Sequence, residues 1–157
     1  MVVVADASPI NYLVLIDQIE ILPRLYARVL VPPAVLQELK HPVAPAPVRD
    51  WAANPPEWLE VLAPKSSYVN VARLDRGESE AIALAIDMHV EVLLIDEQSG
   101  RLEAARRGLK VAGTLSVLDE ADHAGLVDFD TAVARLLQTS FRISQAVLAE
   151  IREKRSV

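Results

Sequence analysis

Two short apolar runs in this sequence each end on an aspartate. VVVA at residues 2–5 leads directly into Asp6, and VLLI at residues 92–95 leads into Asp96. Continuous apolar runs of this length are typical of strands that are buried on both faces. In an open parallel sheet, ligands bind beyond the carboxyl ends of the strands, near the point where the strand order reverses. If these two strands are neighbours, both carboxylates therefore face one site.

Two close carboxylates repel each other, and one of them takes up a proton unless a cation lies between them. Asp6 and Asp96 are therefore candidate ligands of Mg²⁺ or Mn²⁺, which take oxygen ligands and can activate water for phosphodiester hydrolysis. The alternative is that each aspartate caps the helix that follows it, because Asp is favoured at such turns. The similar contexts DAS and DEQS at the two strand ends favour a shared site.

Three glutamates lie on predicted helices beside this pair. Glu80 precedes the run AIALAI, which is apolar all round and typical of a buried helix, so an acid at its start should face a polar site or water. The stretch DRGE at residues 75–78 fits a capping box, which gives Glu78 a structural role. Glu38 lies in PPAVLQEL on a short helix, where a solvated position at the edge of the apolar face is the alternative.

The elements that must position these residues follow from apolar periodicity and from Pro and Gly. We expect strands at 2–5, 29–31, 58–62, 92–95 and 109–112, and helices at 10–16, 19–25, 34–40, 75–89, 99–107, 115–124, 131–138 and 144–154, with a helical turn near 48–53. Ser8 is the expected N-cap of the first helix, followed by Pro9. Alternating strands and helices favour a parallel sheet covered on both faces. We expect a single domain over 1–157, with 115–157 as a C-terminal helical part.

Composition limits the function classes. The chain has 157 residues, of which 52% are hydrophobic and 24% are charged, as in a globular protein. It has no cysteine, which excludes disulfides, thiolate zinc sites and cysteine nucleophiles and fits a cytoplasmic location. We expect no signal peptide, because the N-terminus lacks a basic region and a small-residue cleavage site. We expect no membrane contact, because no apolar run reaches the roughly 18 residues of a spanning helix. The net charge of −6 argues against generic DNA binding.

The ordered set of motifs resembles the PIN-domain proteins, in particular a prokaryotic PIN-like subgroup related to the toxin ribonucleases of toxin–antitoxin systems. The motifs are DASP at 6–9, PPAVLQEL at 32–39, RGESEAIALA at 76–85, LLID at 93–96, GTLSVL at 113–118 and FRIS at 141–144. The resemblance covers nearly the whole chain. Residues 41–56, which are rich in Pro and Ala, fall outside it.

The resemblance implies a three-layer α/β/α fold with a central parallel sheet, and acids that hold Mg²⁺ or Mn²⁺ at one end of it. Its catalytic acids correspond to Asp6, Glu38, Glu80 and Asp96 in this sequence. Of these, Asp6, Asp96 and Glu80 are the implied metal ligands. Many members have Asp where this chain has Glu80, and Glu78 is the alternative for the same role. The implied role of Ser8 is a hydrogen bond to a ligand or phosphate oxygen.

The resemblance therefore implies a metal-dependent ribonuclease with an RNA substrate. By family analogy alone, it also implies the toxin of a toxin–antitoxin pair, an antitoxin protein partner and a homodimer. Arg101 follows Asp96 on a helix and is a candidate contact to the RNA backbone, with a solvated helix face as the alternative. Two other functions stay open: a PIN-like module that binds nucleic acid or protein without cutting it, and a phosphohydrolase acting on a small substrate.

Overall fold

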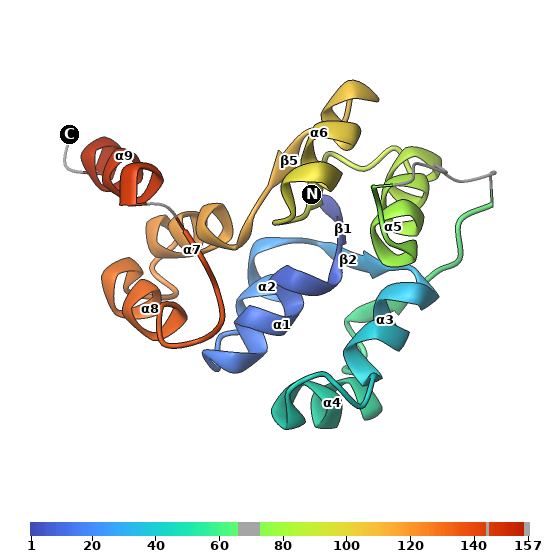
Figure 1. Cartoon of the computed structure of the whole chain (residues 1–157), viewed down its shortest axis with the longest axis horizontal. Coiled ribbons are helices and arrows are strands. Elements are labelled where there is room, and N and C mark those ends of the chain that lie inside the picture. The colour runs from blue at the N-terminus through green and yellow to red at the C-terminus, as the bar shows by residue number, and fades with distance from the viewer. Residues whose placement is uncertain (66–72, 144, 156–157) are drawn as a thin grey trace.

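The sheet places the ends of the two aspartate-terminated strands side by side. A computed structural model describes residues 1–65, 73–143 and 145–155 (Figure 1). Its strands are β1 (Val2–Ala5), β2 (Arg28–Val31), β3 (Leu59–Val61), β4 (Val92–Leu94) and β5 (Val111–Ala112). They are all parallel, in the order β3-β2-β1-β4-β5. The chain moves from β1 to one edge of the sheet and later returns to the other side of β1, so the strand order reverses between β1 and β4.

Helices cover both faces of this sheet. They are α1 (Ala7–Leu15), α2 (Ile21–Leu25), α3 (Pro33–Lys40), α4 (Ala46–Ala53), α5 (Arg76–Asp87), α6 (Gln98–Arg106), α7 (Thr114–His123), α8 (Phe129–Leu136) and α9 (Gln145–Arg155). Figure 1 shows α1, α2 and α7 on one side of the strands and α5 on the other, where α5 packs on β1 and β4. The predicted α/β fold with a central parallel sheet is confirmed.

The central strands form the core because both of their faces are covered. Val3, Val4 and Ala5 of β1 and Leu93 and Leu94 of β4 have no exposed surface. This explains why both strands are continuously apolar instead of alternating apolar and polar residues. The first polar side chains along β1 and β4 therefore come only after the strands end, at the edge of the sheet where ligands bind in such folds.

The first helix begins earlier than the sequence predicted. Asp6 is in the N-cap position of α1, which starts at Ala7, so the prediction of Ser8 as the N-cap is wrong. Pro9 is tolerated there because the first-turn N–H groups of a helix have no intrahelical acceptor. The end of α6 agrees with its prediction, since Gly108 follows it at a φ of 83° that favours glycine.

The C-terminal helices extend the structure beyond α7. Arg155 of α9 is paired with Asp119 and Asp122 of α7 and lies 4.2 Å from the ring centroid of Phe129 in α8. The predicted start of this helix at 144 lies outside the described residues. No helix in the described part of the chain combines the length and the hydrophobicity needed to cross a bilayer.

Candidate functional site

Asp6 is a buried carboxylate at the carboxyl end of β1. Only 4% of its surface is exposed, and its backbone N–H donates to Leu94 O of β4 at 2.8 Å. Its side chain makes no capping hydrogen bond to α1, so the capping alternative does not account for it. Burial raises the pKa of Asp6 well above its usual value, the Ala7 N–H opposes this, and the charges of Glu38, Glu78 and Asp75 raise it further. Burial and the neighbouring negative charges therefore outweigh the Ala7 N–H, and the charged form of Asp6 is disfavoured.

Three carboxylates converge on the space beside Gly77, in the first turn of α5. A Cβ atom at residue 77 would lie 3.2 Å from Glu38 Oε1, 3.5 Å from Asp75 Oδ1 and 3.7 Å from Asp6 Oδ1. Asp6 directly follows β1, Glu38 lies in α3 and Asp75 is the N-cap of α5, so their meeting is a product of the tertiary fold. Burial and the Asp75 charge raise the pKa of Glu38. A glycine at this position keeps open a small volume surrounded by carboxylate oxygens.

Glu78 has one bonded oxygen and one buried oxygen without a partner. The predicted capping box is confirmed: Asp75 Oδ1 accepts from Glu78 N at 2.7 Å, and Glu78 Oε1 accepts from Asp75 N at 3.1 Å. Glu78 Oε2, however, is buried and has no hydrogen-bond donor among the described residues. Burial, opposed by the Asp75 N–H and reinforced by neighbouring acids, raises the pKa of Glu78 to about 6. The capping box thus explains the position of Glu78 Oε1 but not that of Glu78 Oε2.

Both carboxylate oxygens of Glu80 are bonded to groups other than these acids. Glu80 Oε2 accepts from Arg76 Nε at 2.9 Å, and Glu80 Oε1 accepts from the Ala34 N–H at 3.4 Å, in the first turn of α3. Both oxygens of Glu80 therefore have protein donors. Glu78, in contrast, is one of the charges that raise the pKa of Asp6. On α5 it is Glu78, two residues earlier, that is grouped with Asp6 and Glu38.

Asp96 follows β4 and is oriented by the start of α7. Asp96 Oδ1 accepts from Thr114 N and Asp96 Oδ2 accepts from Thr114 Oγ1, both at 2.7 Å. A Cβ atom at Gly113 would lie 2.8 Å from Asp96 Oδ1, so glycine is required for this approach. Burial raises the pKa of Asp96, while the Thr114 bonds and the Arg101 charge oppose the rise. Asp96 thus caps α7 and not the helix that directly follows it.

The predicted substrate-binding residues flank the acids. Arg101 donates from one guanidinium nitrogen to Ile95 O at 3.0 Å, which fixes it at the end of β4 beside Asp96. Ser8 lies in the first turn of α1, and its hydroxyl makes no hydrogen bond to another described residue. Both side chains are therefore near the strand ends, with donors that the fold leaves available.

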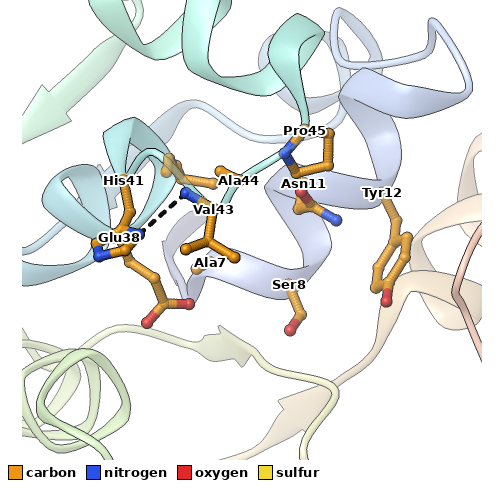
Figure 2. Close-up of a pocket in the computed structure, with 10 residues that line it drawn as sticks. Ala7, Ser8, Asn11, Tyr12, Glu38, His41, Val43, Ala44 and Pro45 are labelled. Atoms are coloured by element: carbon orange, nitrogen blue, oxygen red, sulfur yellow. Dashed lines mark hydrogen bonds between the residues drawn. The ribbon is translucent and has the colours of Figure 1, made fainter.

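An open groove of about 300 Å³ adjoins the acids. Figure 2 shows Ser8, Asn11 and Tyr12 of α1 on one side and Glu38 and the segment from His41 to Pro45 on the other. Sequence reasoning missed Asn11 and Tyr12, because a polar side chain and an aromatic ring on an amphipathic helix carry no distinguishing signal. It also missed Thr114, whose pairing with Asp96 depends on contacts between separate elements.

The donor set fits a divalent cation. The oxygens around Gly77 and the unpartnered Glu78 Oε2 are hard, negatively charged ligands of the kind that Mg²⁺ and Mn²⁺ take. The pKa of Asp6 is raised, so this acid tends to hold a proton when no cation is near. A bound cation would stabilise the charged carboxylate instead. Over residues 1–65, 73–143 and 145–155, no three acidic or histidine side chains are already arranged as a metal site. Binding would therefore require the acids to close around the ion.

Comparisons with known proteins identify the family and the fold of this chain. The DUF3368 family model, described as a PIN domain, matches residues 2–156. The fold is similar to that of a PilT N-terminus domain protein, SSO1118, from the hyperthermophilic archaeon Sulfolobus solfataricus P2. That match has a TM-score of 0.52 and 14% identity, and it covers 92% of this chain and 100% of the other. Among curated proteins, none has significant sequence similarity to this chain. The chain belongs to the PIN-domain family DUF3368, and PIN domains are typically nucleases that use divalent metals.

Proposed function

We propose that this protein is a metal-dependent endoribonuclease that hydrolyses RNA phosphodiester bonds with Mg²⁺ or Mn²⁺. The observation that supports the proposal most is the convergence of the Glu38, Asp75 and Asp6 oxygens on the space beside Gly77. This space lies at the carboxyl end of β1, next to the reversal of strand order, where open α/β sheets bind their ligands. Membership of a PIN-domain family supports nuclease chemistry there.

In this proposal, Asp6, Glu38 and Glu78 hold the cation, and Asp96 completes its environment from the neighbouring strand. Glu78 takes the place that the family resemblance gives to Glu80, because Glu78 Oε2 is buried without a donor while both Glu80 oxygens have donors. Glu80 then has a structural role, because its hydrogen bond with the Ala34 N–H links α5 to the start of α3. When bound, the cation supplies an activated water and stabilises the leaving oxygen of the phosphodiester.

The chain's own residues orient the substrate around this centre. The Thr114 amide and hydroxyl fix the plane of the Asp96 carboxylate. The hydroxyl of Ser8 is free to donate to a phosphate oxygen. One guanidinium nitrogen of Arg101 donates to Ile95 O, and its remaining N–H groups are available to a second phosphate oxygen. No protein nucleophile is needed for this hydrolysis.

Cleavage of a mixed pool of structured RNAs by the purified protein tests this function. We expect cutting with Mg²⁺ or Mn²⁺, no cutting with EDTA, and no cutting by Asp6→Asn with either metal. Asn54→Ala is a matched control, because Asn54 is an exposed residue at the end of α4. Cutting that persists in EDTA or in Asp6→Asn would contradict the proposal.

A second candidate is a PIN-like module that binds nucleic acid or protein without cutting it. Two observations favour it: both oxygens of Glu80 have protein donors, and no ready-made metal cluster exists in the described ranges. It predicts that well-folded protein binds RNA equally with and without metal and leaves it intact. A third candidate, hydrolysis of a small phosphodiester, predicts turnover of such a substrate without RNA cleavage.

The biological role is a proposal by family analogy. The toxin of a toxin–antitoxin pair would form a homodimer in the cytoplasm and would be inhibited by an antitoxin protein that covers the acids. Growth arrest on expression of the wild type, absent with Asp6→Asn, is the expected result. Unimpaired growth with confirmed RNA cleavage would contradict the toxin role and leave the nuclease function standing.

A further inference from the structure

We propose that the groove between α1 and residues 41–45 binds one unpaired nucleobase of the RNA next to the bond that is cut, and that Asn11 determines which base is preferred there. This inference rests on the proposed nuclease function. Glu38 lines the groove and also approaches the space beside Gly77, so the groove opens directly from the acids. A base in this groove would therefore belong to a nucleotide adjoining the reacting phosphate.

One wall of the groove is a single face of α1. Ser8, Asn11 and Tyr12 have the i, i+3, i+4 spacing of neighbours on one helix face. Figure 2 shows Ser8 between Glu38 and the Tyr12 ring, with Asn11 beside Pro45. The wall thus offers a hydroxyl, an amide and an aromatic ring, with the hydroxyl between Glu38 and the ring. A nucleotide could therefore place its phosphate at Ser8, on the side of Glu38, and its base against Asn11 and Tyr12.

The Tyr12 ring is fixed in place. It packs edge-to-face against Phe141, with centroids 5.0 Å apart and an interplanar angle of 84°. Its hydroxyl is 3.1 Å from Ser140 Oγ. A ring that is already immobilised loses little side-chain entropy when a base packs on it, and aromatic side chains stack on any base. Tyr12 therefore supplies a stacking surface without base selectivity.

The opposite wall is held by hydrogen bonds of its own. Ala44 N donates to His41 O at 2.9 Å, and Arg49 Nε of α4 donates to Ala44 O at 3.0 Å. Val43 N donates to His41 Nδ1 at 3.1 Å, so the neutral imidazole carries its proton on Nε2 and keeps one donor. The wall is a fixed turn, and the space of about 300 Å³ between the walls suits a single base but not a duplex.

Asn11 is the side chain in the groove that can select a base. It is half-buried, and its amide makes no hydrogen bond to another described residue. One amide offers a donor and an acceptor side by side, which pair with a base edge presenting the complementary groups, as Asn does with adenine. Ser8 and His41 contribute single donors and select less. The base preference should therefore depend on Asn11.

Mapping of cut sites on random-sequence single-stranded RNA tests the inference. We expect the wild type to prefer one base at one position beside the cut, and Asn11→Ala to lose that preference at least five-fold at that position alone. Asn54→Ala, the same change outside the groove, should keep it. Tyr12→Leu should raise KM about ten-fold while Tyr12→Phe does not, because only the ring is needed for stacking.

A second measurement separates this inference from the nuclease function. Fluorescence anisotropy in the non-cutting Asp6→Asn background reports the binding of five-nucleotide RNAs of each base. Adding Asn11→Ala to that background should equalise the four affinities, whether or not the wild type cuts. An unchanged base preference in Asn11→Ala, by cut-site mapping or by anisotropy, would overturn the inference. Loss of cutting in every variant and the wild type would count only against the nuclease function.

Discussion

Thr114 binds both carboxylate oxygens of Asp96, one through its backbone N–H and one through its hydroxyl, each at 2.7 Å. The two residues are 18 positions apart, with Asp96 just after β4 and Thr114 at the start of α7. Because one residue supplies both donors, the carboxylate plane is fixed relative to α7. Asp96 is thereby oriented at the carboxyl end of β4 before any substrate arrives.

Replacing Thr114 tests this orientation. Thr114→Val removes the hydroxyl donor from a buried carboxylate, and we expect it to lower the free energy of unfolding by about 1–3 kcal/mol. It should also raise the pKa of Asp96 further, because the Thr114 bonds hold it down. Urea denaturation and the pH profile of kcat measure the two effects. Thr114→Ser should restore the pH profile, and a Val variant with the wild-type profile would show that the hydroxyl is dispensable.

The acids should make the metal-free protein more stable at lower pH. Asp6, Glu38 and Glu78 all have folded-state pKa values above their usual ones, so the folded protein binds more protons than the unfolded chain. Stability therefore falls as pH rises through the folded pKa. For Glu78, the rise from 4.5 to about 6 corresponds to about 2 kcal/mol.

Thermal unfolding in EDTA from pH 4.5 to 8 measures this dependence. We expect Tm to decrease across the range, and we expect Mn²⁺ to raise Tm more at pH 7 than at pH 5. Glu78→Gln keeps a side chain suited to the capping box and should flatten the decrease. A Tm that increases with pH in the metal-free protein would contradict the account.

The two glutamates of α5 should respond differently to neutralisation. Glu78→Gln should weaken Mn²⁺ binding and reduce kcat at least ten-fold, because it removes a charge that is grouped with Asp6. Glu80→Gln should leave Mn²⁺ affinity within about two-fold of the wild type and mainly lower stability, because its partners are Arg76 and Ala34. Isothermal titration and single-turnover cleavage measure both. The reverse pattern would return the ligand role to Glu80.

Gly77→Ala should separate stability from metal binding. Alanine is favoured over glycine in a helix by up to about 1 kcal/mol, so the variant should fold at least as well as the wild type. Its Cβ would lie 3.2 Å from Glu38 Oε1 and would displace that carboxylate. We therefore expect weaker Mn²⁺ binding and slower cleavage. A fully active Gly77→Ala protein would show that the space beside this residue is not used.

The sequence was sufficient to predict that the strands ending at Asp6 and Asp96 would be neighbours. Both follow continuously apolar strands, and the alternation of strands and helices implied a parallel sheet in which such strand ends meet. The pairing of β1 with β4 confirms this adjacency. The start of α1 was less predictable, because Ser8 and Asp6 are both good N-cap residues and the choice depends on where β1 stops.

Sequence could not decide which glutamate of α5 approaches Asp6. Glu78 and Glu80 are two positions apart and so point to nearly opposite sides of the helix. Which side faces β1 depends on how α5 is rotated on the sheet and how closely it approaches its neighbours. Gly77 and Gly100 permit those approaches, since a Cβ at Gly100 would lie 2.9 Å from Glu78 Oε2. Such packing distances have no signature in a single sequence.

Direct titration of Mn²⁺ into the purified protein, followed by electron paramagnetic resonance, tests the central claim most directly. The account predicts saturable binding to the wild type, retained in Asn54→Ala and lost in Asp6→Asn, and competition by Mg²⁺. Binding to Asp6→Asn as tight as to the wild type, or no saturable binding to any of these folded proteins, would contradict a metal site formed by the acids at the end of β1.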